Sequence, residues 1–375
     1  MFEMPNNNIL LFIKTPPPVT GATSMNKSVH DSELLNRFFN IRSICISYMK
    51  NRSEMGKWKI RKLFIFIGIL KKLISELRKH RPVFVYFQLS PHGVAFFRDL
   101  IYVVIIKAYK IKIVYHLHGK GINEKITIFK YFYRYAFNKE YVICLSSLLT
   151  YDIADVFSGQ IFIVPNGIPD IKIEDYKGNP GKVIRLLYLS NLIKSKGILD
   201  YIEAMKLLDE KGYEYEGLIV GAEADLTKDE LNEILRDKGI IGKVKYLGPK
   251  YSELKNSTLA NSDILVFPTQ NETFGIVNLE AMQFAKPIIS TRLAAIPEIV
   301  DDGITGFIVD INSPKQIAEK IEILINDPDL RRRMGEAGRK KYEERYTINK
   351  FEENMKVVFR EALDDIISKN KTKIK

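Results

Sequence analysis

Two glutamates eight residues apart, Glu272 and Glu280, have the most informative types and spacing in the chain. They follow an apolar strand pattern over 264–267 that stops at Pro268, and Glu280 falls about one turn into a helix pattern over 276–285. Backbone N–H groups at such a helix start suit an anion such as a diphosphate, and a carboxylate one turn further in can bind a diol such as a ribose. On spacing alone, the favoured interpretation is an ordinary helix with an acidic start and one exposed glutamate.

The longer string around this pair favours a binding site over an ordinary helix. Residues 268–310 resemble the donor-binding core of the retaining glycosyltransferase family 4, which has the GT-B fold. The pattern of that family is a Glu-x7-Glu pair that encloses Phe-Gly and continues with Ala-Met, followed by Lys-Pro, Pro-Glu and G-x-x-G. The chain matches it at Glu272, Phe274, Gly275, Glu280, Ala281, Met282, Lys286, Pro287, Pro297, Glu298, Gly303 and Gly306.

Size and composition indicate a globular protein of ordinary make-up. A length of 375 residues suits two domains. The two cysteines, Cys45 and Cys144, lie in apolar surroundings and favour a reducing compartment over a disulfide scaffold. The N-terminal apolar run is too short for a signal peptide, and no stretch reaches the roughly 18 apolar residues of a membrane span. The sequence therefore predicts a cytoplasmic location.

Positive charge is concentrated in the first half. Residues 1–177 hold 26 Lys and Arg against 13 Asp and Glu, and the remainder holds 31 against 32. A basic half suggests an anionic partner, and nucleic acid is the least favoured one because no nucleic-acid-binding module is recognisable. The apolar segment 57–81 has nine Lys and Arg against Glu76 alone, which is typical of a helix peripheral to an anionic membrane. A helix packed on a sheet with a solvated basic face explains the same pattern.

Short apolar runs, such as residues 43–49, alternate with helix-length segments in both halves, which predicts parallel, doubly wound sheets. A turn-rich stretch, 172–182, is typical of an interdomain linker. We therefore predict an α/β protein with one Rossmann-like domain over 1–177 and another over 178–350. The resemblance implies the GT-B arrangement, in which the two domains face a central cleft and a C-terminal helix, about 351–375, packs back on the first domain.

Lys196 follows the first strand of the second half, where a lysine can neutralise charge on a departing diphosphate. Taken alone, a solvated loop lysine is the more usual explanation. Members of the family have Arg-x4-Lys-Gly here; Lys196 and Gly197 fit, but Asn191 stands at the arginine position. Lys194 is a candidate substitute for the missing cation. Gly221 matches a family glycine near the nucleotide.

The first half contributes four further positions to the resemblance. Gly21 and Ala22 stand where the family has a Gly-rich loop that faces donor phosphate and acceptor. His118 ends a strand and matches the family's histidine next to the donor sugar. Two histidines two apart, His116 and His118, could bind a metal, but no third ligand is apparent, and His116 has a structural interpretation. Asn166 belongs to the Pro-Asn-Gly turn that the family carries at the cleft.

The resemblance implies a retaining hexosyltransferase that uses a nucleoside-diphosphate sugar and a saccharide or lipid-linked saccharide acceptor, without cofactor or metal, in cell-surface polysaccharide or glycolipid synthesis. Two alternatives stay open: a sugar-nucleotide epimerase of the same fold, and a non-catalytic protein that binds nucleotide sugar or membrane. By matching positions, the catalytic candidates are Glu272, Lys196 and His118. The donor-binding candidates are Glu280, Phe274, Gly275, Ile276, Asn191, Gly21, Ala22, Gly221 and Asn166.

Overall fold

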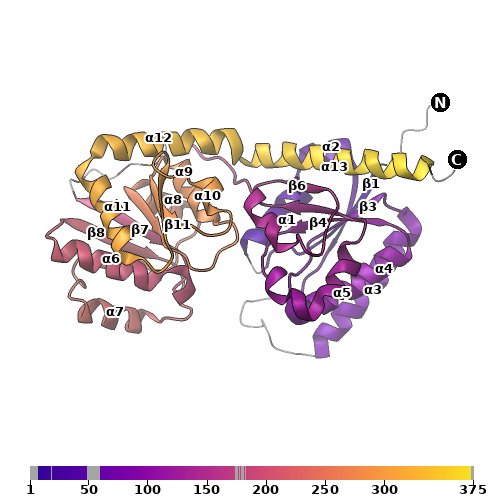
Figure 1. The fold of residues 1–375 in the computed structure, drawn as a ribbon, viewed down its shortest axis with the longest axis horizontal. Coiled ribbons are helices and arrows are strands. Elements are labelled where there is room, and N and C mark those ends of the chain that lie inside the picture. The colour runs from indigo at the N-terminus through magenta and orange to yellow at the C-terminus, as the bar shows by residue number, and fades with distance from the viewer. Residues whose placement is uncertain are drawn as a thin grey trace. The chain divides into compact units, whose positions relative to one another are not determined.

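The computed structural model describes residues 7–17, 19–48, 60–173, 176, 178, 181 and 183–372. The chain divides into two compact units, drawn in Figure 1. Unit 1 comprises Met1–Asn166 and Ile348–Lys375, and unit 2 comprises Gly167–Thr347. The division between the units therefore precedes the linker expected over 172–182, and the last helix belongs to unit 1.

Unit 1 contains a six-stranded parallel sheet in the order β2-β1-β3-β4-β5-β6. The strands are β1 (Asn8–Ile13), β2 (Asn40–Cys45), β3 (Phe84–Phe87), β4 (Lys112–Leu117), β5 (Tyr141–Cys144) and β6 (Ile161–Ile163). The helices are α1 (Gly21–Asp31), α2 (Glu33–Phe38), α3 (Ile60–His80), α4 (Gly93–Ala108), α5 (Ile126–Phe137) and α13 (Ile348–Thr372), with short 3-10 helices η2 (Asn123–Lys125) and η3 (Ser147–Asp152).

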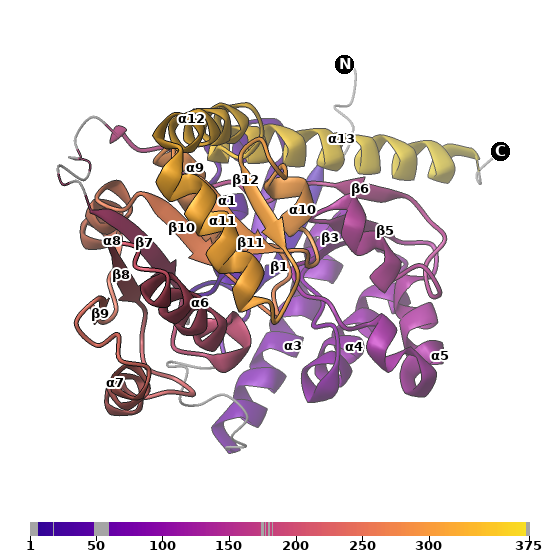
Figure 2. The same cartoon turned by 60° about the vertical axis from the view of Figure 1, so that its left-hand side comes forward.

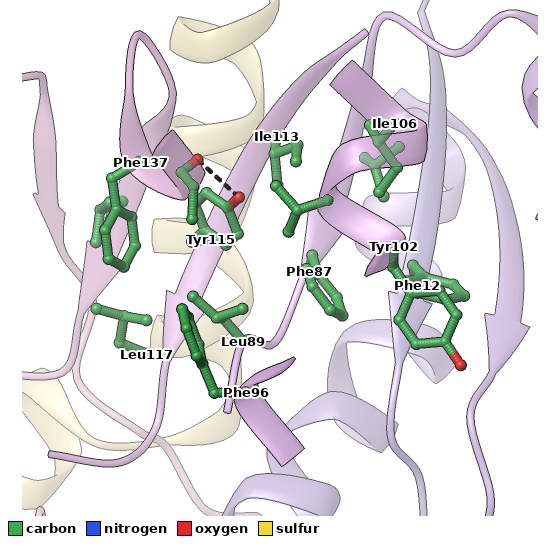
Figure 3. Close-up of a cluster of buried hydrophobic side chains, with 14 of the residues drawn as sticks. Phe12, Phe87, Leu89, Phe96, Tyr102, Ile106, Ile113, Tyr115, Leu117 and Phe137 are labelled. Atoms are coloured by element: carbon green, nitrogen blue, oxygen red, sulfur yellow. Dashed lines mark hydrogen bonds between the residues drawn. The ribbon is translucent and has the colours of Figure 1, made fainter. Parts of the chain in front are cut away.

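Alternate residues of these strands enter two separate apolar cores, as the period-2 pattern of a strand requires. Phe12 of β1 packs with side chains of α3, α4 and α5, whereas Leu11 packs with side chains of α1, α2 and α13. Figure 3 shows the first of these cores, in which the Tyr115 hydroxyl donates to the Ala136 carbonyl at 3.0 Å. Helices thus cover both faces of the sheet, and its central strands, such as β3 and β5, are buried on both sides.

Strand β2 is the clearest correction to the expected elements. The apolar run 43–49 predicted a strand there, but the strand is Asn40–Cys45. It pairs in parallel with β1 residue by residue, from Asn8 with Asn40 to Ile13 with Cys45. Because β2 lies at the edge of the sheet, its neighbour sets its limits, and its polar residues tolerate exposure.

Unit 2 contains a second six-stranded parallel sheet, in the order β12-β11-β10-β7-β8-β9. Its strands are β7 (Ile184–Leu189), β8 (Tyr215–Val220), β9 (Val244–Tyr246), β10 (Ile264–Phe267), β11 (Ile288–Thr291) and β12 (Gly306–Val309). Its helices are α6 (Ile198–Glu210), α7 (Lys228–Asp237), α8 (Ser252–Ala260), α9 (Ile276–Gln283), α10 (Ile296–Ile299), α11 (Pro314–Asn326) and α12 (Pro328–Arg345), which Figure 2 shows around the sheet.

The predicted doubly wound topology is confirmed in each unit. In unit 2 the chain builds β7, β8 and β9 toward one edge and then β10, β11 and β12 toward the other, so the strand order reverses between β7 and β10. In unit 1 the reversal lies between β1 and β3. The carboxyl ends of strands beside such a reversal are where open α/β sheets bind ligands. None of the helices in the described part of the chain is long and apolar enough to cross a membrane.

Candidate functional site

Lys196 and Glu272 meet at the reversal point of the unit 2 sheet. Lys196 ends the 3-10 helix η5 (Lys194–Lys196) after β7, and Glu272 lies in the loop after β10. The Lys196 ammonium donates to Glu272 Oε2 at 2.9 Å and to the Asn271 carbonyl at 2.6 Å. Both side chains are about a fifth exposed, 23% and 22%. Two of the three residues predicted to be catalytic are therefore in contact, at the edge where the topology favours a ligand.

Close backbone approach holds this pair in place. Gly197 has a φ of +79°, and a Cβ there would lie 1.9 Å from the Pro268 carbonyl oxygen, so a side chain would push the two loops apart. The second oxygen of Glu272, Oε1, accepts from the Thr273 amide at 2.8 Å. The carboxylate is thus tied to its own loop by one oxygen and to the β7 loop by the other.

Glu280 lies in α9 and forms an ion pair that the sequence reasoning missed. Its Oε1 is 2.6 Å from the ammonium of Lys255 in α8, and the two side chains are 19% and 28% exposed. A lysine in an ordinary amphipathic stretch, well before the motif, gives no signal of this contact. The pair holds the Glu280 carboxylate in one orientation while leaving it open to solvent.

The start of α9 has the backbone geometry expected of an anion site. Gly275 caps the helix in a left-handed conformation, φ +85°, and no side chain caps it. Phe274 is buried, its ring lies 6.4 Å from that of Tyr346, and its backbone N–H donates to Glu272 Oε1 at 3.4 Å, so its side chain is not available to a ligand. Ile276 is the first helical residue. Uncapped N–H groups together with the helix dipole favour a negative group here.

Asn278, in the first turn of α9, is another residue that the sequence reasoning missed. It is fully buried, and neither atom of its amide has a hydrogen-bond partner among the residues that the structure describes. A Cβ at Gly275 would lie 2.7 Å from its Nδ2. Asn278 therefore packs directly beneath Gly275. The sequence pattern of α9 gave no sign of this polar residue, because an aliphatic side chain would fit the pattern at that position equally well.

Asn191 joins two loops of unit 2. Its Oδ1 accepts from the Ala222 amide at 3.2 Å, which links the loop after β7 to the loop after β8. Gly221 makes the same approach possible, because a Cβ there would lie 1.8 Å from the Ser190 carbonyl oxygen. Lys194 is exposed, and its backbone N–H donates to Asp225 Oδ2 at 3.1 Å. Asn191, which stands where the family has an arginine, thus links two backbone loops and carries no charge.

In unit 1, the rings of His116 and His118 pack against each other at the end of β4, with centroids 4.0 Å apart and planes tilted by 37°. His116 is fully buried, and its Nδ1 lies 2.6 Å from the Tyr86 hydroxyl, which fits the structural interpretation. Burial, and then the neighbouring His118, hold the pKa of His116 well below its ordinary value. Burial lowers the pKa of His118 to about 3. Both rings are therefore neutral near pH 7.

His118 differs from His116 in its hydrogen bonding. Within the described residues, neither ring nitrogen of His118 has a partner, although both are buried. A buried polar group without a partner costs about 1–3 kcal/mol, which favours a ligand group that supplies the missing hydrogen bond. Asn166, after β6, has a comparable feature: it is buried and its Oδ1 has no partner in the same part of the chain.

The loop after His118 is fixed by Asp152, which the sequence reasoning also missed. The buried carboxylate of Asp152 accepts from the amides of Gly121, Ile122 and Asn123 at 3.0–3.2 Å. Three converging N–H groups form a backbone nest that stabilises a negative charge. Asp152 therefore positions the chain that leaves the β4 end.

Gly21 and Ala22 open α1, which Thr20 caps: the Thr20 hydroxyl accepts from the Thr23 amide at 3.1 Å. Gly21 is exposed and Ala22 is partly exposed. Over the residues that the structure describes, no group of three or more His, Cys, Asp or Glu gathers as a metal site would require.

Comparisons with known proteins show which family unit 2 resembles. Residues 170–341, almost all of unit 2, match the family model described as glycosyl transferases group 1. An uncharacterized glycosyltransferase of Methanocaldococcus jannaschii is 28% identical over 63% of this chain and 64% of its own length. The capsular polysaccharide biosynthesis glycosyltransferase CapM of Staphylococcus aureus is 35% identical over 43% of this chain and 41% of its own length. The matches thus span less than two thirds of these relatives.

The similarity in structure extends further than the similarity in sequence. The crystal structure of Anabaena Alr3699/HepE in complex with UDP superposes with a TM-score of 0.71 at 17% identity, over 95% of this chain and all of that one. At this identity the likeness concerns the fold, and it confirms the GT-B architecture expected from the sequence.

Proposed function

Unit 2 of this chain belongs to the glycosyl transferases group 1, and from that premise we propose that the protein is a retaining hexosyltransferase. The donor is a nucleoside-diphosphate sugar, and the acceptor is a saccharide or a lipid-linked saccharide. The product belongs to cell-surface polysaccharide or glycolipid synthesis, as the name of the Staphylococcus aureus relative suggests for that protein.

The contact between Lys196 and Glu272 beside the uncapped start of α9 is the observation that carries the proposal. The α9 amides and Lys196 bind the diphosphate, and the charge that grows on it as the sugar departs is stabilised where positive potential is already in place. Glu280 binds the ribose through charge-assisted hydrogen bonds. Glu272 binds sugar hydroxyls. The UDP bound by the Anabaena protein of the same fold supports a nucleoside diphosphate as the leaving group.

Unit 1 contributes the acceptor side and His118. As a neutral ring with both nitrogens unpartnered among the described residues, His118 can donate to one hydroxyl and accept from another. Gly21, Ala22 and Asn166 complete the proposed contacts of unit 1 with substrate. The protein uses no metal or other cofactor in this scheme, since lysine and helix amides supply the positive potential. It works in the cytoplasm, at the inner face of the cell membrane.

Incubation with a panel of nucleoside-diphosphate sugars, without acceptor, tests the proposal. Slow release of the free sugar with its anomeric configuration retained is the expected result, and Lys196→Ala serves as the impaired control. Interconversion of donor sugars would identify an epimerase instead. A chain that binds the donor, as a thermal shift reports, but never breaks the sugar–phosphate bond would be a non-catalytic binding protein, and the proposed reaction would be wrong.

A further inference from the structure

Helix α4 carries an apolar stripe on the side that faces away from the sheet. Phe96, Tyr102, Val103 and Ile106 fill the core, and Figure 3 shows several of them. The opposite side presents Val94, Phe97, Ile101 and Val104, each at least 38% exposed and spaced by three or four residues. A helix on the surface of a globular protein normally has polar residues on that side. Here that side carries the four exposed apolar residues as well, which indicates a second apolar contact.

Helix α5 continues the stripe. Tyr131 is 86% exposed, and Phe132 and Tyr135 are 45% exposed. The ring of Phe97 lies 5.6 Å from that of Phe132 and 5.1 Å from that of Phe129, so the two helices form one continuous apolar surface. Side chains with an apolar body and a polar tip, such as Tyr131 and Tyr135, suit a boundary between hydrocarbon and water.

Helix α3 packs beside α4 through Phe66, whose ring is 5.4 Å from that of Tyr102, and both views of the fold show α3, α4 and α5 together (Figures 1 and 2). Its first turns expose Leu63, Phe64 and Ile67. We call the exposed sides of these three helices the three-helix face. Its exposed large apolar residues are Leu63, Phe64, Ile67, Val94, Phe97, Ile101, Val104, Tyr131, Phe132 and Tyr135.

The charges of the three helices are almost all positive. α3, α4 and α5 contain ten Lys and Arg and two acids. Neither acid adds exposed negative charge of consequence: Asp99 is fully buried against Lys14 and Arg98, and Glu76 is 21% exposed and lies 3.8 Å from Arg42. The bases include Lys71, Lys72 and Arg134, all exposed. Apolar side chains among bases, without exposed acids, complement a surface that is apolar inside and anionic at its boundary.

We infer that the three-helix face docks on an anionic lipid bilayer. The inference relocates the membrane contact expected from segment 57–81, of which residues 57–59 lie outside the described residues, to three helices with α4 and α5 at the centre. Apolar side chains enter the headgroup boundary, and bases around them bind lipid phosphates. This inference rests on the proposed function in one respect only, namely that the bilayer carries a lipid-linked acceptor.

Flotation of the full chain with vesicles, without nucleotide, tests the inference. The wild type should bind phosphatidylglycerol vesicles at low salt, and bind less at high salt and on phosphatidylcholine vesicles. Val94→Ser, Ile101→Ser and Tyr131→Ser combined should weaken binding at least about tenfold, because three inserted side chains are lost. The matched control is Ile323→Ser with Val357→Ser, two exposed apolar residues outside the face, and it should bind as the wild type does.

A charge series separates the electrostatic part. Lys71→Gln, Lys72→Gln and Arg134→Gln together should weaken binding by about fivefold for each base that reaches the anionic surface. Lys228→Gln, Lys315→Gln and Arg333→Gln, exposed bases of unit 2, should not. Donor hydrolysis without vesicles should be unchanged in all four variants, so loss of vesicle binding and loss of activity are distinguishable.

Two results would overturn the inference. One is a wild type that ignores anionic vesicles at low salt, or a serine variant that still binds them fully. The other is a wild type that sedimentation shows to be a dimer, with a monomeric serine variant, because the face would then be covered by a second copy of the chain.

Discussion

The ammonium of Lys196 and the carboxylate of Glu272 are 2.9 Å apart, although 76 positions separate the two residues in the chain. They belong to loops that follow neighbouring strands, so the reversal of strand order brings them together. The two side chains are partly exposed, 23% and 22%, and ion pairs that water reaches contribute only about 0–1 kcal/mol to stability. A pair that is weakly stabilising and placed at the ligand edge can reorganise readily when a diphosphate arrives.

We predict that Lys196→Ala lowers turnover more than donor affinity. The lysine acts most strongly on charge that develops in the transition state, and loss of one such donor typically costs about 10²–10³ in kcat. Steady-state kinetics on the transfer reaction would measure kcat and KM separately. If KM alone rose, Lys196 would bind the ground state only. Lys196→Arg, which keeps the charge, should recover part of the rate.

Glu272→Gln tests the other partner of the pair. Removing the carboxylate frees the Lys196 ammonium for the diphosphate, so a nucleoside diphosphate should bind as well as or better than it does to the wild type. Transfer should fall, because the contact to sugar hydroxyls is weakened. Calorimetry with the nucleoside diphosphate and turnover measurements check the two parts. Weaker nucleotide binding would show that Glu272 does not compete for Lys196.

Glu280→Ala should weaken nucleoside-diphosphate binding by at least about tenfold, because each hydrogen bond to a charged group contributes about 1.5–3 kcal/mol. Lys255→Ala is the matched control, since it breaks the same ion pair without removing the carboxylate. Calorimetry should show the larger loss for Glu280→Ala. Equal affinities for wild type and Glu280→Ala would show that Glu280 does not bind the ribose.

Gly221→Ala should destabilise unit 2 by about 1–3 kcal/mol or more, because the new Cβ would lie 1.8 Å from the Ser190 carbonyl oxygen and must displace backbone. Gly242→Ala adds the same methyl group where no atom lies within 4 Å, and should be tolerated. Denaturant unfolding compares the two. A Gly221→Ala chain as stable as the Gly242→Ala chain would contradict the close approach of the β7 and β8 loops.

Acidification should destabilise unit 1 through His118. The folded-state pKa of about 3 is below the unfolded value of about 6.5, so the unfolded chain binds more protons between these values. The contribution of neutral His118 to the free energy of unfolding is therefore fully present above about pH 6.5. It decreases as the pH drops toward 3, and at pH 5 about 2 kcal/mol of it is lost. Unfolding titrations near neutral pH and near pH 5 should show a smaller loss for His118→Phe than for the wild type. The exposed His92, changed to Gln, is the control. Equal losses in all three chains would contradict a neutral His118 with buried ring nitrogens.

The two doubly wound sheets and the loop around Glu272 were predictable because their signals are local. Apolar runs of strand length, and glycines and prolines at their ends, are read directly from the sequence. The limits of β2 were not, because pairing with β1 sets them. The contact of Glu280 with Lys255 and the three amides on Asp152 depend on the tertiary positions of ordinary-looking residues. Asn191 had a visible signal, its departure from the family pattern, but its bond to Ala222 required the structure.

Unit 1 is made of two stretches of chain with all of unit 2 between them. Helix α13 brings Phe351, Met355 and Phe359 to the apolar core that contains Leu11 and Tyr86. During synthesis the sheet of unit 1 emerges before unit 2, with α1 and α2 on one of its faces, yet the part of that face that α13 covers stays open until α13 leaves the ribosome. Unit 2 can therefore complete its folding earlier than unit 1 does. A chain that ends before α13 would leave Leu11, Tyr86 and their neighbours without the apolar side chains of α13.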